Sequence, residues 1–253
     1  MEFIKNIFEI LEKYDSYLLK GLGYTMLIAL VGTVIGLAIG LIAGIIRTIP
    51  KSKDKAVAVL QKCVDILINV YVEIFRGTPM MVQALIIYYS IFVPMKMPAM
   101  ISAIIIISFN TGAYMAEIVR GGIMSIDKGQ FEGAHAVGMN HFQTMYHVIL
   151  PQAVKNIMPS IGNEFVGNIK DSSVLSIIAI TELMFVAKQA GGTYAKPVPS
   201  YIICALIYFV LTFTVTRLLR LAEKKLSGSD SYTICGSQSD PDAEIHIKGE
   251  GAN

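Results

Sequence analysis

Cysteine is scarce in this chain, and charged residues are few. The three cysteines, Cys63, Cys204 and Cys235, lie far apart in the sequence. Their spacing fits neither a disulfide framework nor a metal-binding set, so neither is expected to organise the fold. Charged residues make up 16% of the chain and hydrophobic residues 54%, and the mean hydropathy is +0.58. This composition is more apolar than that of a typical globular domain and indicates an integral membrane protein.

Signatures of nucleotide binding and of hydrolytic chemistry are also missing. No segment matches the Walker A pattern G-x-x-x-x-G-K-S/T, so any energy that the protein draws from a nucleotide has to come from another protein. Neither an H-E-x-x-H set nor a paired nucleophile and base occurs in the apolar segments, which argues against a membrane-embedded enzyme. His135, His141 and His147 recur at a regular interval, but six residues turn a helix by about 240°, and no further ligand completes a metal site. We expect no metal site.

Long apolar segments predict the membrane spans. Residues 22–46 are enough for the ~20 residues that a helix needs to cross the hydrocarbon core, and they are too long for a cleavable signal peptide. Further spans are expected at 65–92, at 99–119, at 152–187 with interruptions, and at 201–221. The sequence therefore predicts an all-α integral membrane protein with five transmembrane helices.

Glycine recurs every fourth residue in the first span, at Gly32, Gly36, Gly40 and Gly44. Small residues at this spacing form a stripe that lets a neighbouring helix approach closely. The ordinary enrichment of glycine in membrane helices is the alternative interpretation.

The two ends of the chain differ from its middle. Residues 1–20 form a charged amphipathic segment, which we expect either to lie along the outer interface or to be a plain solvated helix end. Residues 227–253 are rich in Ser, Gly, Asp and Glu, and are predicted to be a disordered polar tail.

Basic residues predict the orientation of the spans. They crowd the loop after the first span and follow the last span, and basic loops face the cytosol. With five spans, this places the N-terminus outside and the C-terminus in the cytosol. The polar segment 127–151 then also faces the cytosol. The basic residues are Arg47, Lys51, Lys53, Lys55, Lys62, Arg217, Arg220, Lys224 and Lys225.

Helix-capping signals in residues 127–151 predict two short helices. Asp127 is the expected N-cap of the first, with a hydrophobic staple formed by the flanking Ile126 and Phe131. A left-handed C′ residue is expected at Gly138, a second cap at Asn140 with Gln143, and an N1-type proline at Pro151.

The same segment carries a family motif. Glu132-Gly133-Ala134, then Gly138, then Val148-Ile149-Leu150-Pro151 resembles the EAA loop of ABC-importer permeases. Gly133 stands where the family has Ala, and Val148 where it commonly has Ile. The flanking residues resemble the polar amino acid uptake permeases, a type I transmembrane subunit of the histidine, glutamine and arginine permease kind. These residues are Arg76 to Pro79, Asn110 to Tyr114, Glu117, Arg120 to Gly122, Gly162 to Phe165 and Lys170 to Ser173.

The resemblance implies a multi-protein importer in the bacterial plasma membrane. Residues 21–222 would be its transmembrane permease domain, and the chain itself would be no enzyme. A separate ATPase subunit, which binds the ATP and Mg, would receive the 127–151 loop, and this chain would bind no cofactor. The other expected partners are a second permease subunit, identical or paralogous, an extracytoplasmic amino acid-binding protein and the lipid bilayer, with no nucleic acid. The residues expected to couple to the ATPase are Glu132, Gly133, Ala134, Gly138 and Pro151.

Polar residues in the fourth span suggest a solute path, because an ionisable group in a membrane costs on the order of 2.5–3.5 kcal/mol unless protein or water receives it. Pro159 and Gly162 predict a kink or break beside them. Glu164 either takes the amino group of an amino acid or pairs internally with Lys170, Arg120 or a partner subunit. The predicted path residues, some of which recur every fourth position, are Glu164, Asn163, Asn110, Ser160 and Asn168.

Two further interpretations concern the third span and the class of transporter. Glu117 and Arg120 are spaced for an i, i+3 ion pair at the cytosolic end of that span. A self-contained channel or secondary transporter would need an internal repeat with two matched broken segments, and the sequence contains one strongly broken segment.

Overall fold

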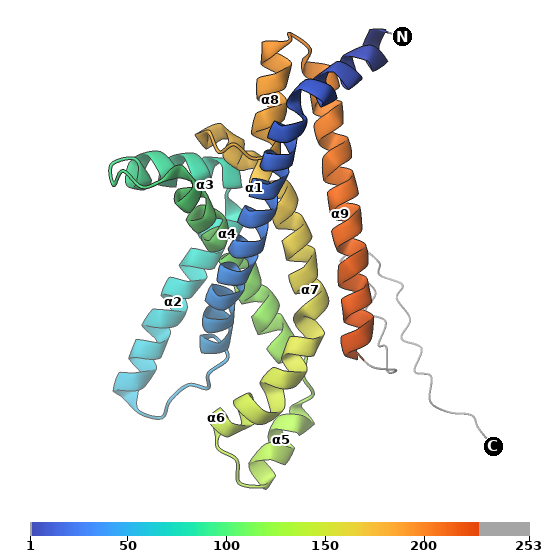
Figure 1. Cartoon of the computed structure of the whole chain (residues 1–253). Coiled ribbons are helices and arrows are strands. Elements are labelled where there is room, and N and C mark those ends of the chain that lie inside the picture. The colour runs from blue at the N-terminus through green and yellow to red at the C-terminus, as the bar shows by residue number, and fades with distance from the viewer. Residues whose placement is uncertain (1, 228–253) are drawn as a thin grey trace, which may run out of the picture.

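The computed structural model describes residues 2–227, and all regular structure in that range is helical. The predicted tail, apart from Ser227, and Cys235 lie outside the described residues. Figure 1 shows the long helices running roughly alongside one another, with α3 projecting to one side. In chain order the elements are α1 (Glu2–Ile46), α2 (Lys55–Gly77), α3 (Met80–Ile87), η1 (Tyr88–Phe92), α4 (Ala99–Met124), α5 (Lys128–Ala136), α6 (His141–Thr144), η2 (Met145–Ile149), α7 (Leu150–Asp171), η3 (Ser172–Ile178), α8 (Leu183–Thr193) and α9 (Pro197–Ser227).

The most extensive helix pair is α1 with α4, and the glycine stripe forms its seam. A Cβ atom on Gly36 would lie 2.7 Å from Cβ of Thr111, and one on Gly44 would lie 2.7 Å from Cβ of Val119. Gly32 and Gly40 likewise face side chains of α4. The prediction of a closely packed neighbour is therefore confirmed, since any side chain at these positions would separate the two helices.

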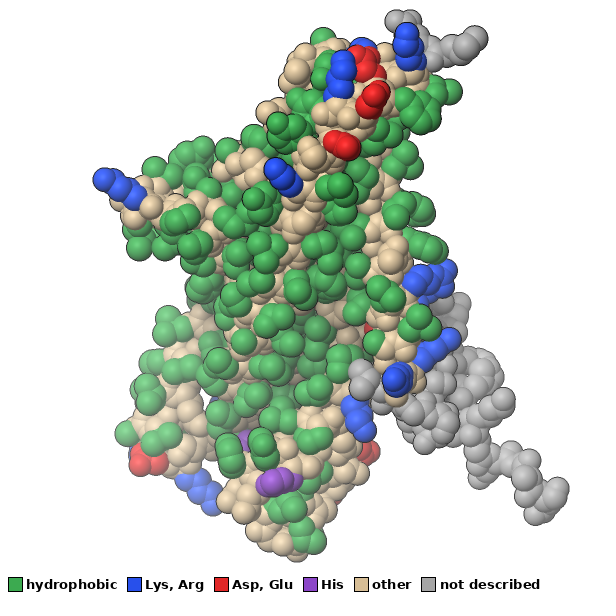
Figure 2. Space-filling view, viewed as in Figure 1, with side chains coloured by type: hydrophobic (Ala, Val, Ile, Leu, Met, Phe, Trp, Pro, Cys, Tyr) green, Lys and Arg blue, Asp and Glu red, His purple; other side chains and the backbone are tan. Residues whose placement is uncertain are grey.

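The molecule has two polar ends and an apolar middle. The loop after α1, the α5–α6 hairpin and the C-terminal end of α9 point toward one end, whereas the N-terminus and α8 lie at the other (Figure 1). On the face in Figure 2, hydrophobic side chains cover the middle, and charged side chains gather mainly toward the two ends. This distribution is the one expected of a protein whose middle contacts lipid.

Among residues 2–227, three helices are long and apolar enough to cross a membrane, namely α1, α4 and α9. A fourth span results if the helix ending at Ile178 and α8, which meet at an angle of 51°, are counted together. The predicted second span, residues 65–92, falls on the upper part of α2, on α3 and on η1, and it is interrupted at Thr78 and Pro79. The count of five spans therefore stays a prediction.

The break in the fourth predicted span lies later than expected. The helix α7 continues through Pro159 and Gly162 to Asp171, so the helix is not broken at those two residues, and a kink there, the other predicted form, stays a prediction. A proline need not end a helix that neighbouring elements hold in place. The chain instead leaves the helix after η3, where Ala179 has a left-handed φ of 62°.

The N-terminal segment is continuous with the first span and packs against the α8–α9 turn. Ile10 and Leu18 are buried in an apolar cluster with residues of α8 and α9. Lys196 donates to Glu9 at 2.9 Å, and the Tyr14 hydroxyl donates to Thr193 at 3.3 Å. Residues 2–20 are therefore part of the helical assembly at this end.

Candidate functional site

Between α4 and α7 the chain forms a helical hairpin, residues 127–150, at one end of the molecule (Figure 1). Asp127 caps α5, because its carboxylate accepts a hydrogen bond from the backbone N–H of Gly129 at 2.6 Å. Ile126 is buried in an apolar cluster against which Phe131 packs, which is the arrangement of a hydrophobic staple. The predicted start of the first hairpin helix is confirmed.

The turn after α5 depends on a left-handed glycine. Gly138 has a φ of +82°, a conformation that costs a residue with a Cβ atom about 1–2 kcal/mol. The N–H of Met139 donates to the carbonyl of Ala134 at 3.1 Å, and that of Gly138 donates to His135 at 3.0 Å. These are the two bonds of a Schellman motif, so Gly138 occupies the predicted C′ position.

The second half of the hairpin begins with a reciprocal cap. The Asn140 side chain accepts from the backbone N–H of Gln143 at 2.9 Å, and the Gln143 side chain accepts from that of Asn140 at 3.0 Å. The helix then continues through the π-helical turn η2 into α7, and Pro151 stands in the first turn of α7 as predicted. Both hairpin helices are thus fixed by short-range bonds.

The five predicted coupling residues differ in their exposure. Glu132, Gly133, Gly138 and Pro151 are exposed, whereas Ala134 is buried. A Cβ atom on Gly133 would meet no other atom within 4 Å. The outer side of α5 therefore leaves room for another molecule beside Glu132 and Gly133.

An exposed apolar surface accompanies these residues, and we call it the hairpin patch: Val137, Phe142 and Tyr146. Their exposed fractions are 74%, 76% and 61%, and the rings of Phe142 and Tyr146 stack with centroids 6.3 Å apart. A shallow pocket of about 370 Å³ adjoins it, lined by Val137, Gly138, Met139, Gln143 and His147. Exposed apolar patches mark sites of contact with partners. The i, i+4 spacing of the two aromatic residues was the signal in the sequence.

The polar residues of α7 form an open group and a buried one. Asn163 is exposed, and Ser160 and Glu164 are partly exposed. Asn168 is buried, with its side-chain oxygen accepting from the Thr111 hydroxyl at 2.9 Å and its amide donating to Thr33 at 2.8 Å. Asn168 thus joins α7 to α4 and α1, behind the open group.

Asn110, on α4, is also buried, with 7% of its surface exposed. Its amide donates to the side-chain oxygen of Gln83 on α3 at 2.9 Å. Two of the five predicted path residues, Asn110 and Asn168, therefore use their polar atoms within the protein, and their role in a solute path stays a prediction.

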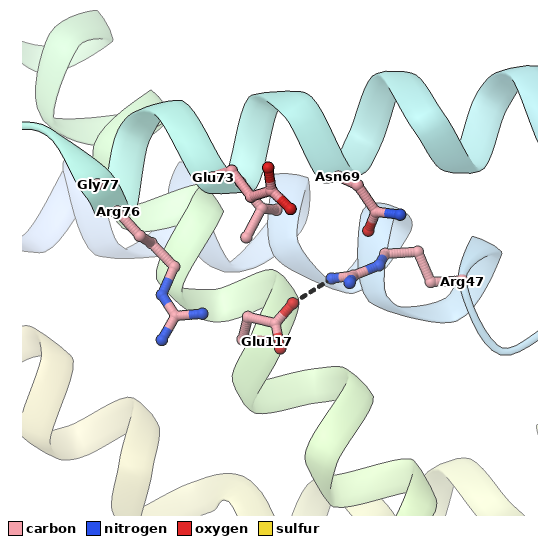
Figure 3. Close-up of a pocket in the computed structure, with 7 residues that line it drawn as sticks. Arg47, Asn69, Glu73, Arg76, Gly77 and Glu117 are labelled. Carbon is pink, nitrogen blue, oxygen red and sulfur yellow. Dashed lines mark hydrogen bonds and ion pairs between the residues drawn. The ribbon is translucent and has the colours of Figure 1, made fainter.

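A pocket of about 400 Å³ lies between the end of α1, α2 and α4. Figure 3 shows Arg76, Glu73 and Asn69 on α2 beside it, with Glu117 of α4 bound to Arg47, the residue after α1.

Glu117, one of the two acidic residues that line the pocket, binds two arginines. Glu117 pairs with Arg120 at 3.0 Å, which confirms the predicted i, i+3 ion pair, and its other oxygen pairs with Arg47. Because Arg47 directly follows the end of α1, this pair also fixes the start of the following loop.

Arg76 of α2 lies against an aromatic ring of α4, and α7 carries two acidic residues. The Arg76 guanidinium lies 5.6 Å from the ring centroid of Tyr114. The two acidic residues of α7 are Glu164 and Asp171. Within residues 2–227, Glu164 forms no ion pair. The Glu164 carboxylate is therefore available on the open face of α7.

Residues 36–228 of the chain match the family described as binding-protein-dependent transport system inner membrane component. The chain belongs to this family. The resemblance to ABC-importer permeases, drawn from the motif between Glu132 and Pro151, is thereby confirmed.

Individual relatives of this permease agree with the family. The arginine transport system permease protein ArtQ of Bacillus subtilis (strain 168) is 37% identical over 162 residues, which are 63% of this chain and 74% of ArtQ. The probable amino-acid ABC transporter permease protein YckA of the same strain is 33% identical over 229 residues, covering 88% and 95%.

Two solved structures share its fold. A chain in the crystal structure of an amino acid ABC transporter with histidines is 35% identical, with a TM-score of 0.73, covering 85% of this permease and 96% of that chain. A chain of the inward-facing MetNI methionine ABC transporter has a TM-score of 0.67 at 19% identity, covering 84% and 99%. The second likeness concerns the fold alone.

The permease also uses polar residues that the sequence did not single out. Glu182 is fully buried and caps α8, accepting from the N–H groups of Met184 and Phe185 at 2.8 Å each. It also accepts from the Tyr208 hydroxyl on α9 at 2.8 Å. Its place just before an apolar helical run was the available signal, whereas nothing local indicates that Tyr208 is its partner.

Proposed function

We propose that this chain is the transmembrane permease subunit of an ATP-driven importer that moves a polar amino acid across the bacterial plasma membrane. A separate ATPase subunit drives it through residues 127–151, and an extracytoplasmic binding protein delivers the solute. The observation that carries the proposal is the rigid hairpin, which presents an exposed Glu132 and the apolar hairpin patch at one end of a membrane protein.

The hairpin has the properties of a mechanical connection. Caps at Asp127 and Asn140 and the left-handed Gly138 hold its shape. Buried residues fix it to α4 and α7, since Ile123 of α4, Ile149 of the hairpin and Ala153 of α7 share one apolar cluster. A partner that moves the hairpin would therefore tilt α4 and α7 as rigid bodies rather than bend the hairpin.

The orientation follows from the basic residues. We infer five crossings, made by α1, by α2 with α3, by α4, by α7 and by α9. The loop after α1 and the end of α9, which carry the basic residues, lie toward the same end as the hairpin (Figure 1). By the positive-inside rule that end is cytosolic, where the ATPase is located, and the N-terminus is outside.

The open face of α7 is the proposed solute path. Ser160, Asn163 and Glu164 line it, and two buried residues support it, Asn168 of α7 itself and Asn110 of the neighbouring α4. A carboxylate at Glu164 suits the amino group that every amino acid carries, and the guanidinium of Arg76 suits a carboxylate. Relatives named for arginine transport, for putative glutamine transport and for L-cystine transport support a polar amino acid as the solute.

The functional unit contains further chains. One such permease provides half of a pore, so we infer a second permease subunit, identical or paralogous. The chain itself binds no cofactor and hydrolyses no ATP, and ATP with Mg binds to the ATPase subunit.

Reconstitution tests this proposal. The chain should copurify with an ATP-hydrolysing subunit, and vesicles containing both, supplied with the binding protein, should accumulate a polar amino acid only with ATP. Uptake by this chain alone would refute it.

One substitution tests the solute path. Glu164→Gln removes the charge but keeps the size, so uptake should fall while the ATPase stays bound. Unchanged uptake would leave Glu164 a structural residue.

A further inference from the structure

At the joint between α2 and α3 the backbone lacks a hydrogen-bond donor, and a side chain takes its place. α2 ends at Gly77, and Thr78 is extended with φ −124° and ψ 150°. Pro79 follows without an N–H group, so it cannot donate to the carbonyl of Phe75, four residues earlier. An unsatisfied backbone carbonyl away from water costs several kcal/mol.

Gln83 supplies the missing donor. Its side-chain nitrogen lies 2.8 Å from the Phe75 carbonyl oxygen, 2.9 Å from that of Thr78 and 2.8 Å from the Thr78 hydroxyl oxygen. The residue is 6% exposed. Gln83 therefore holds the end of α2 against the start of α3 without a continuous helix between them.

The other end of the same amide is tied to α4. The Gln83 oxygen accepts from Asn110 at 2.9 Å. One turn further along α4, the Tyr114 ring lies against the guanidinium of Arg76. Because α4 runs unbroken from Ala99 to Met124 into the hairpin, the joint and the hairpin are attached to the same rigid helix.

We propose that Gln83 and Asn110 are positioning residues that tie the α2–α3 joint to α4, so that movement of the hairpin resets the position of Arg76 beside the solute path. This inference rests on the proposed function, because it assigns the hairpin as the moving part. It adds a route by which that movement reaches the pocket between α2 and α4.

The test measures coupling in the complete transporter, reconstituted in vesicles with its ATPase subunit and binding protein. Gln83→Met and Asn110→Leu remove the amide link with side chains of similar size. Each should lower the number of amino acids imported per ATP hydrolysed about tenfold, the scale of typical coupling energies, while ATP hydrolysis continues. The double variant should import as many amino acids per ATP as the single variant with the lower ratio, because both substitutions break the same link.

The control removes a comparable buried hydrogen bond elsewhere on α4. Thr111→Val loses the bond to Asn168 but does not touch the joint, so it should keep the wild-type ratio. If the joint variants also keep that ratio, or if their effects multiply in the double variant, the proposal is wrong. Should Gln83→Met not assemble, Asn110→Leu carries the test, because it leaves the Gln83 contacts with α2 in place.

A second readout follows the joint itself. Gly77 is exposed with no atom within 4 Å of an added Cβ, so Gly77→Cys in a chain freed of its native cysteines is a suitable reporter. Its rate of thiol labelling should differ between nucleotide-free and ATP-bound transporter, and Gln83→Met should abolish the difference. Equal rates in the parent, or a difference that survives Gln83→Met, would overturn the proposal.

The two proposals fail in different ways. If the unmodified complex shows no ATP-dependent uptake, the proposed function is wrong. If uptake depends on ATP but the joint variants behave like Thr111→Val, only the positioning role is wrong.

Discussion

Adding one methyl group at the α1–α4 seam should destabilise the protein, whereas the same change elsewhere on α1 should not. In Gly36→Ala the new Cβ would lie 2.7 Å from Cβ and 2.8 Å from Cγ2 of Thr111. These distances are shorter than van der Waals contact, so α4 has to move. Gly23, on the same helix, has no atom within 4 Å of an added Cβ.

The magnitudes give opposite signs for the two variants. Alanine is preferred over glycine inside a helix by roughly 0.5–1 kcal/mol, which should stabilise Gly23→Ala. Overpacking typically costs about 1–3 kcal/mol, which leaves Gly36→Ala destabilised by as much as about 2.5 kcal/mol. Displacing Thr111 would also strain its bond to Asn168.

The chain offers its own probe for this measurement. Cys204 is 3% exposed, so a thiol-reactive dye detects it only when the protein unfolds. With Cys63 and Cys235 replaced by serine, the unfolding temperature should fall in Gly36→Ala and rise slightly in Gly23→Ala. A shift of the same sign in both variants would refute the close packing of α1 on α4.

Two further predictions concern the hairpin and the buried polar contacts. Gly138→Ala should weaken binding of the ATPase and lower the stability of the protein by about 1–2 kcal/mol, because position 138 has a left-handed backbone. Gly133→Ala lies inside a helix with open space around it and should retain both binding and stability. Equal ATPase binding by the two variants would contradict the turn geometry. Asn168→Leu should lower the stability of the protein by about 1–3 kcal/mol, because it leaves the Thr111 hydroxyl without its acceptor. In the Cys204 dye assay, the control Asn163→Leu, at an exposed position, should unfold at the wild-type temperature. An equal loss of stability in both variants would argue against the buried contact.

The features that sequence predicted best depend on neighbouring residues. The caps at Asp127 and Asn140 and the left-handed Gly138 are determined within a few positions, so their residue types were sufficient. The glycine stripe predicted a close helix but not its identity, because only the fold brings α4 to Gly36.

Features that depend on distant residues were missed or misplaced. Pro159 and Gly162 predicted a kink or a break, and α7 has no break there, because a proline can be held inside a helix by tertiary packing. The bond from Asn110 to Gln83 joins residues 27 positions apart, and no periodicity in either segment indicates it. For the same reason, the sequence assigned Asn110 and Asn168 to the solute path without showing that they are buried.

The account rests on the hairpin as the attachment point of an ATPase, and a charge reversal there tests it most directly. Glu132→Lys should lose ATPase subunits on purification, and vesicles containing the variant should lose ATP-dependent uptake. Glu12→Lys reverses an exposed charge at the opposite end of the molecule and should retain both. Full ATPase retention and uptake in Glu132→Lys would contradict the account.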